Sequence, residues 1–251
     1  MLTNKEIRKR ASAMALESGT LLKLSLGVCF CVASAMIPFL ISSLLAEFAS
    51  LGAEEPNLVV SLDMIALGIL LAVFLTLPVI GGFFGMAYKL YHAEKVHLAY
   101  IFSPFASAKK YFGIVFAGGL MLLRLVAIIS IPVAVATLMS GVNLFEDAFL
   151  NGLLSGLAVG GAVALALLFA VCTMQMYFVP YFLCRGFGVT ESISKSRALL
   201  KKRKGKLIGY ILGFTGIFLL SLLTVGALFV VYTIPLMIFA YFIYADQLTS
   251  I

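Results

Sequence analysis

Long apolar runs, separated by short polar segments, divide the chain along its whole length. A helix rises about 1.5 Å per residue and the hydrocarbon core of a bilayer is about 30 Å thick, so about 20 apolar residues can cross it. The pattern predicts an all-α, polytopic integral membrane protein in which residues 1–251 form a single membrane domain. Six transmembrane helices are predicted, over about 24–45, 64–88, 113–139, 152–182, 207–223 and 227–245.

The last three of these spans come from two unusually long runs. The 36 residues Phe149–Cys184 would reach about 54 Å as one helix. They begin at an acidic loop and end at a basic one, so we predict a single crossing by a long or tilted helix with a kink near Pro180. The 39 residues Leu207–Ala245 carry no charge, and a break at Thr224–Gly226 predicts two short spans joined by a tight turn.

Composition supports a membrane protein. Hydrophobic residues make up 63% of the chain and charged residues 12%, against roughly 45–50% and 25% in soluble domains. A soluble fold has too little interior to hide so many apolar side chains, so much of the surface should face lipid.

Basic and acidic loops alternate along the chain. Of the 18 Lys and Arg residues, 17 lie in the N-terminal segment or in the loops after the second and fourth spans. The other two loops contain six acidic residues and no Lys or Arg. The positive-inside rule places the N-terminus in the cytoplasm, and the final hairpin returns the C-terminus there. The net charge of +7 therefore reflects topology, and no nucleic-acid partner is expected.

The loop after the fourth span is predicted to contain a cytoplasmic amphipathic helix. Val189, Ile193, Ser196 and Leu200 fall on one helical stripe, and Thr190 could cap the first turn. Basic helices of this kind lie at the membrane surface, where each Lys or Arg near anionic lipid contributes about 1 kcal/mol. The candidate contacts for anionic headgroups are Lys195, Arg197, Lys201, Lys202, Arg203 and Lys204.

Arg124 is the one basic residue within a predicted span, about 20 Å along the helix from Lys110. Buried charges in membranes usually face a partner inside the bundle. Gln175 and Tyr177, near Pro180, are the neutral candidates for a shared intramembrane polar site. Two interpretations stay open: a site for an anion, headgroup or solute, and a structural arginine that bonds to carbonyl groups or reaches outward along its stem.

Gly152, Gly156 and Gly160 recur every four residues and so lie on one helix face. Small residues let a second helix approach closely in a membrane. Contact within the chain is favoured over dimerisation, although a homo-oligomer or a further membrane partner stays open. Gly81 and Gly85 predict a second, shorter packing face.

No motif predicts a reaction. The chain contains no G-x-S-x-G, H-E-x-x-H or C-x-x-C pattern and no phosphate-binding glycine loop. His92 and His97 are five residues apart, off a common helix face, and Glu94 does not complete a metal set with them. We therefore expect no catalytic residues, no metal and no cofactor.

Several segments resemble one known family. ISKSRALLKKRKGKL, LSLLTVGALFVVYTIP and AYFIYADQL are similar to the C-terminal signature of the bacterial membrane family called domain of unknown function 975. LTNKEIRKRASAMALESGTLLKLSLG and GMAYKLYHAEKVHLAYIFSPFASAKKYFG resemble its N-terminal and central cytoplasmic segments. The resemblance implies a six-span protein of the bacterial cytoplasmic membrane without an established activity. It also implies a distant likeness to the membrane domain of glycerophosphodiester phosphodiesterases.

The expected function is a non-enzymatic one. The pattern favours an envelope-associated accessory or scaffold protein of the bacterial cytoplasmic membrane that contacts anionic lipid headgroups. The alternative is a small solute or lipid transporter, or a permease subunit, that uses a site around Arg124.

Overall fold

The computed structural model describes residues 2–17, 19–50, 58–140, 148–201, 203–223 and 229–250, and these ranges contain helices and connecting segments but no strand. Five helical stretches in the described residues are long and apolar enough to cross a membrane. They are Thr20–Leu45, Ala66–Tyr91, Ala108–Leu138, Asn151–Cys184 and Phe229–Thr249. The chain is therefore an all-helical protein with several helices compatible with a membrane.

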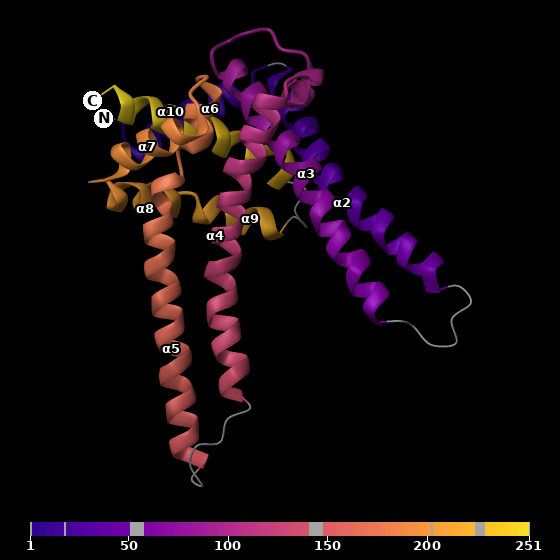
Figure 1. The fold of residues 1–251 in the computed structure, drawn as a ribbon. Helices are drawn as coiled ribbons and strands as arrows, with labels where there is room; N and C mark the ends of the chain where they lie inside the picture. The colour runs from indigo at the N-terminus through magenta and orange to yellow at the C-terminus, as the bar shows by residue number, and fades with distance from the viewer. Residues whose placement is uncertain are drawn as a thin grey trace.

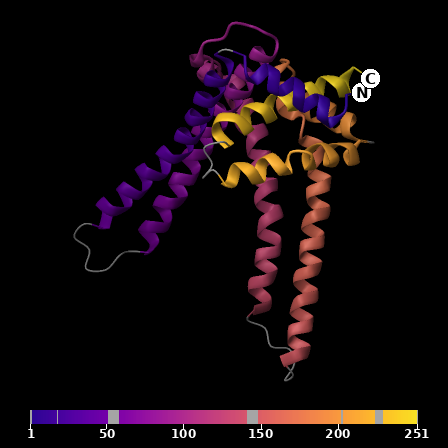
Figure 2. The same cartoon turned by 180° about the vertical axis from the view of Figure 1, so that it is seen from behind.

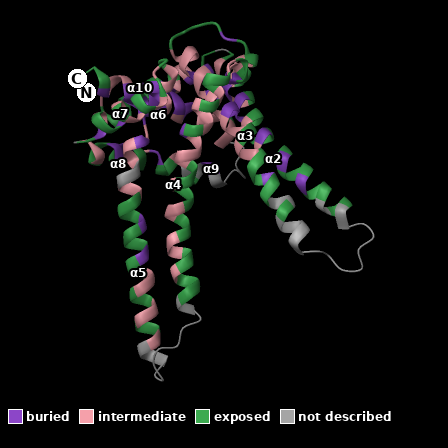
Figure 3. Cartoon of the chain, viewed as in Figure 1, coloured by how far each residue is buried: buried purple, intermediate pink, exposed green. Residues whose placement is uncertain are grey.

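Two long helical hairpins form the extended part of the molecule. The first pairs α2 (Thr20–Ser50) with α3 (Leu58–Tyr91), and the second pairs α4 (Ala108–Ser140) with α5 (Ala148–Thr173). The two hairpins extend from one compact end of the molecule and diverge from each other (Figures 1 and 2). Most of their far surface is exposed and apolar (Figure 3), as lipid-facing helices require.

The fourth predicted span is interrupted. Helix α5 ends at Thr173, a short 3₁₀ turn η2 (Met174–Met176) follows, and α6 (Val179–Cys184) begins with Pro180 in its first turn. The break therefore precedes Pro180, which opens a new helix rather than kinking an old one. Proline suits this position because a first-turn residue needs no N–H partner.

The compact end, here called the head, gathers short elements from distant parts of the chain. It comprises α1 (Asn4–Ala15), η1 (Leu98–Ala106), α6, α7 (Val189–Leu200), α8 (Lys204–Leu212), η3 (Phe229–Thr233) and α10 (Ile234–Thr249). Both termini lie here, side by side (Figures 1 and 2). The three basic segments predicted from the sequence are thus at one end of the hairpins.

Helix α1 begins with a capping box. The Thr3 hydroxyl accepts a hydrogen bond from the Glu6 backbone N–H, and the Thr3 backbone N–H donates to Glu6 Oε2 at 2.7 Å. The bond from the Thr3 backbone, and then that from its hydroxyl, lower the pKa of the Glu6 carboxyl. Ile7, Ala11 and Ala15 form a fully buried stripe that packs against α10.

The C-terminal third differs from the predicted pair of spans. Residues 207–223 lie in two nine-residue helices, α8 and α9 (Thr215–Leu223), with a break between them at Gly213 and Phe214. Each is about 13 Å long, too short to cross a bilayer. The predicted turn at Thr224–Gly226 lies outside the described residues.

The predicted sixth span, 227–245, corresponds to η3 and α10, and hydrogen bonds place both ends of this unit at the head. Ser25, in the second turn of α2, donates to the Val231 carbonyl at 3.2 Å, and the Ser12 and Tyr232 hydroxyls are 3.2 Å apart. At the other end Asp246 accepts a hydrogen bond from Tyr91, the last residue of α3. Helix α10 therefore lies across the head instead of running along the hairpins.

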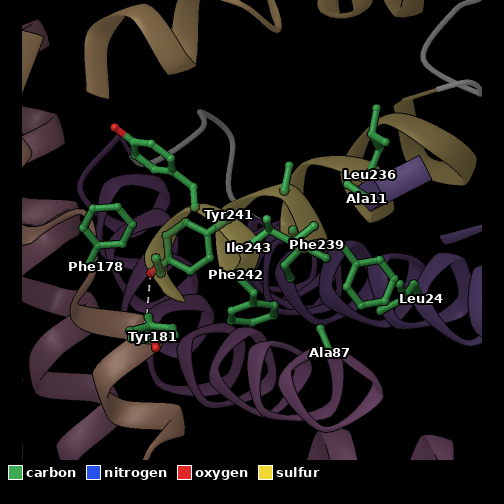
Figure 4. Packing of buried hydrophobic residues seen from close by; sticks show 14 of the residues in the cluster. Ala11, Leu24, Ala87, Phe178, Tyr181, Leu236, Phe239, Tyr241, Phe242 and Ile243 are labelled. Atoms are coloured by element: carbon green, nitrogen blue, oxygen red, sulfur yellow. Dashed lines mark hydrogen bonds between the residues drawn. The ribbon is translucent and has the colours of Figure 1, made fainter. Parts of the chain in front are cut away.

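Helix α10 is the centre of the core. Its residues from Ile238 to Ala245 are all buried. Around them lie Ala11 of α1, Leu24 of α2, Ala87 of α3 and the α6 region with Phe178 and Tyr181 (Figure 4). A helix that is apolar on every side is suited either to lipid or to a protein core, and here it fills a protein core.

Candidate functional site

A basic groove lies on the surface of the head. It has a volume of about 560 Å³ and is lined by residues of α6, α7, the segment after α7 and α10. These residues are Phe182, Lys195, Ala198, Leu199, Lys201, Arg203, Leu248 and Thr249. Three cations therefore surround an apolar floor, an arrangement that fits an anionic group attached to an apolar one.

The three cations of the groove are held differently. The Arg203 guanidinium donates to the Leu248 carbonyl at 3.0 Å, which ties α10 to the end of α7. Lys195 forms an ion pair with Glu191 at 3.0 Å and lies over the Phe187 ring. Lys201 is exposed, with no ion pair to the described residues. Lys201 is thus the most available cation for a ligand.

The other predicted lipid contacts lie outside the groove. Arg197 is exposed and Lys204 half-buried at the start of α8, and neither lines the groove. Lys202 lies outside the described residues. The structure thus brings together Lys195, Lys201 and Arg203 from the predicted set.

Helix α7 confirms an amphipathic helix in this segment but corrects two details. Its fully buried stripe is Ser192, Ser196 and Leu200, so the stripe is rotated relative to the one predicted through Val189 and Ile193. Its N-cap is Gly188, without a side-chain hydrogen bond, and Thr190 does not cap it. Helix α7 packs on η2 and α6, and the small side chains of Ser192 and Ser196 are buried there.

A second candidate site surrounds Arg124, midway along α4. The residue borders an open cavity of about 600 Å³ where α3, α4, η2 and α10 meet. The walls are aromatic and aliphatic side chains and four methionines, with Tyr177, Tyr210 and Tyr241 among them. This cavity, called the Arg124 cavity below, contains a single charged side chain.

Few groups of the described residues interact with the positive charge of Arg124. Its Nη1 donates to the Met176 sulfur, and a thioether is only a weak acceptor for a guanidinium with five N–H donors. Among the described residues no carboxylate forms an ion pair with it. The structure therefore does not show the carbonyl-bonded arginine that was one of the two interpretations.

Only one of the two predicted partners of Arg124 lies at the cavity. Tyr177 lines the same cavity, whereas Gln175 does not. The Gln175 carbonyl instead accepts a hydrogen bond from Ser196 Oγ at 2.6 Å, and the Phe178 N–H donates to the same oxygen atom of Ser196 at 3.2 Å. Gln175 thus contributes its backbone to the η2 break, and Arg124 and Tyr177 remain as the site.

Most of the cavity lining was not predicted from the sequence. Met176, Tyr210 and Tyr241 come from η2, α8 and α10, and no periodicity links segments so far apart in the chain. Tyr241 also fixes the cavity wall, because its hydroxyl donates to the Tyr177 carbonyl and accepts from the Tyr181 N–H, both at 3.1 Å (Figure 4).

Asp246 forms a polar cluster that the sequence did not single out. It accepts hydrogen bonds from Tyr91 at 2.7 Å and from Tyr181, and Arg185 donates to the Tyr181 hydroxyl at 3.1 Å. The signal available was an isolated acid at the end of 39 uncharged residues. The cluster connects α3, α6 and α10, and we interpret it as a structural contact between these helices.

The predicted glycine faces have opposite outcomes. A Cβ atom added at Gly152, Gly156 or Gly160 would have no neighbour within 4 Å, so the contact within the chain favoured for them is not found. Gly81 packs against Ile114 of α4, where a Cβ would come within 2.6 Å, and Gly85 against Tyr100. The shorter glycine face is therefore the one used for packing.

Comparison of this chain with protein-family models, with curated proteins and with solved structures finds no match.

Proposed function

We propose that this protein is a non-enzymatic accessory or scaffold protein of the bacterial cytoplasmic membrane, anchored by its apolar hairpins, whose head holds anionic lipid headgroups. The proposal includes membership of the family called domain of unknown function 975, and cytoplasmic placement of both termini. The charge pattern supports that placement, since basic segments favour the cytoplasmic side.

The basic groove is the observation that carries this proposal. Lys195, Lys201 and Arg203 border an apolar floor that includes Leu199 and Leu248. A phosphate at the lipid interface would meet the cations while the attached glycerol and chain meet the apolar residues. Cations near anionic lipid contribute about 1 kcal/mol each, or about fivefold in binding.

The test compares lipid retention by native mass spectrometry of protein released from nanodiscs of mixed phosphatidylglycerol and phosphatidylcholine. Replacing Lys195 and Lys201 by Gln should lower the retained phosphatidylglycerol by roughly 25-fold, because two cations of the groove are lost. Lys201→Gln alone should lower the retained phosphatidylglycerol by about fivefold.

The matched control is the pair Lys109→Gln and Lys110→Gln. These lysines are exposed at the start of α4 and lie outside the groove. Equal losses from the control and the groove variants would refute a groove-specific contact, and an unchanged lipid preference in both would refute lipid binding by these residues.

The alternative function is a small solute or lipid transporter, or a permease subunit, and the Arg124 cavity favours it. A cation inside an apolar recess could hold an anionic substrate during transfer. Reconstituted vesicles separate the two functions, since a scaffold leaves the flux of headgroup-labelled lipid unchanged and a transporter raises it in a manner that depends on Arg124.

A further inference from the structure

The Arg124 cavity combines features that together specify a class of ligand. Its volume of about 600 Å³ falls within the roughly 300–1,000 Å³ of small-molecule sites. Its lining is apolar apart from Arg124 and tyrosine hydroxyls, and methionines adapt readily to flexible chains. The space suits a hydrocarbon chain better than a polar solute.

The positive charge of Arg124 indicates that the polar end of the ligand is an anion. An arginine guanidinium keeps its positive charge in proteins, and that of Arg124 donates to the Met176 thioether among the described residues. A cation in apolar surroundings is costly without a counter-charge. The side-chain hydroxyls of Tyr177 and Tyr210 make no hydrogen bond with the described residues, so both can donate to an anion.

Access to the cavity is from the hairpin surface. Leu125, which lines the cavity, is 57% exposed on α4, a helix apolar and long enough to cross a membrane. An acyl chain could thus enter sideways from the hydrocarbon region, whereas a water-soluble anion would have to leave water to reach Arg124.

We propose that the Arg124 cavity binds an anionic amphiphile, with its phosphate or carboxylate on Arg124 and its acyl chain along the cavity wall of Met121, Leu125 and Ile128. This site is separate from the basic groove, since the two share no lining residue. The inference therefore stands whether or not the groove binds lipid. A phospholipid and a free fatty acid share the required chemistry.

The chain contains no tryptophan, so one introduced tryptophan can report on the cavity alone. Ile128→Trp places the reporter in the lining, and Leu123→Trp places a control on the same helix at a position that is 66% exposed and outside the lining. Quenching is measured in vesicles with brominated phosphatidylglycerol, brominated phosphatidylcholine of the same chains, or a brominated fatty acid.

The expected result is a preference of about 5–10-fold for brominated phosphatidylglycerol over phosphatidylcholine at Ile128→Trp, and less than about twofold at Leu123→Trp, because a charge-assisted bond forms only in the cavity. A stronger effect of the fatty acid than of phosphatidylglycerol would identify a carboxylate as the headgroup. Equal quenching by the anionic and zwitterionic lipids at Ile128→Trp would overturn the proposal.

Variants assign the preference to the guanidinium. Arg124→Gln in the Ile128→Trp protein should abolish it, whereas Arg124→Lys should keep part of it, which separates the charge from any effect on folding. Lys195→Gln with Lys201→Gln should leave it unchanged. A preference that survives Arg124→Gln would contradict the assignment, and a loss in the groove variant alone would place the anion in the groove instead.

Discussion

At the residue scale, Ser196 shows how a single small side chain supports a break in a long apolar helix. Its hydroxyl donates to the Gln175 carbonyl and accepts from the Phe178 N–H, so it satisfies one backbone group within η2 and one just after it. Those groups would otherwise be buried without a partner, which is costly in protein and in lipid. The turn that presents Met176 and Tyr177 to the Arg124 cavity thus depends on a residue of α7.

Ser196→Ala should lower the apparent Tm in detergent by about 2–10 °C, because an unpaired buried N–H costs about 1–3 kcal/mol and the chain has 251 residues. Thermal unfolding followed by circular dichroism measures the loss. Ser194→Ala, at an exposed position on the same helix, should change Tm by less than about 2 °C. An equal Tm for both variants would contradict the role assigned to Ser196.

Single residues were predictable only where their chemistry conflicts with the surroundings. Arg124 stands out as a charge in an apolar run, and the structure places it at a cavity. Ser196 was predicted to lie on the apolar stripe of its helix, and the structure confirms that it is buried there. Its hydrogen bonds to residues about twenty positions away could not be predicted, because no local pattern encodes a tertiary contact.

At the element scale, α2, α3 and α4 cover the first three predicted spans, α5 covers the fourth only as far as Thr173, and α10 lies in the core of the head. All of these segments are apolar along their length, and hydropathy alone cannot separate a lipid-exposed helix from one buried in protein. The difference lies in what surrounds them. Leu153, Leu157 and Leu167 of α5 are exposed, whereas Phe239 and Phe242 of α10 are buried.

Two glycine substitutions test which helix faces pack inside the chain. Gly82→Ala should lower the apparent Tm markedly, because the added Cβ would overlap the Ile101 carbonyl of η1, a backbone group that cannot easily move. Gly156→Ala should keep or slightly raise Tm, since its Cβ would enter open space and alanine favours a helix by about 1 kcal/mol over glycine.

Both glycine variants are measured in one detergent, with the particle mass determined by light scattering. A lower Tm at Gly156→Ala accompanied by a lower mass would reveal contact between copies through α5. An unaltered Tm at Gly82→Ala would show that η1 does not lie against α3 as described.

At the scale of the whole molecule, the head bears on the number of membrane crossings, since five described stretches, not six, are long and apolar enough to cross. Both termini lie at one end of the hairpins (Figures 1 and 2), so the chain should cross the membrane an even number of times. The hairpins supply four long helices, and α10 has both ends at the head. Although Phe229–Thr249 is long and apolar enough to cross a membrane, we propose four crossings by the hairpin helices, with α10 as a core helix of the head.

A crosslink distinguishes the four-crossing from the six-crossing arrangement. Ser25 and Val231 are in contact through a 3.2 Å hydrogen bond. In a six-span chain they would lie near opposite faces of the bilayer, about 30 Å apart. Cysteines at these two positions, with the native cysteines replaced by serine, should crosslink in membranes with a short bis-maleimide, as seen by a shift on gel electrophoresis.

The control pair joins Ser25→Cys to a cysteine at Thr137, which is near the far end of α4. This pair should remain uncrosslinked because the two positions lie at opposite ends of their hairpins. Failure of the Ser25–Val231 pair to crosslink would favour the six-span arrangement, and crosslinking of the control would contradict both arrangements.

The contact between α1 and the C-terminal elements also constrains folding during translation, because α1 is synthesised long before the elements it packs against. Asn4 and Arg8 donate hydrogen bonds to the Gly209 and Gly213 carbonyls, and Ile7 is buried in the core built on α10. Translation proceeds at about 5–20 residues per second, so α1 waits on the order of ten to forty seconds for α10. During that interval its apolar stripe has no native partner, and the nascent chain depends on the bilayer surface or a chaperone to shelter it.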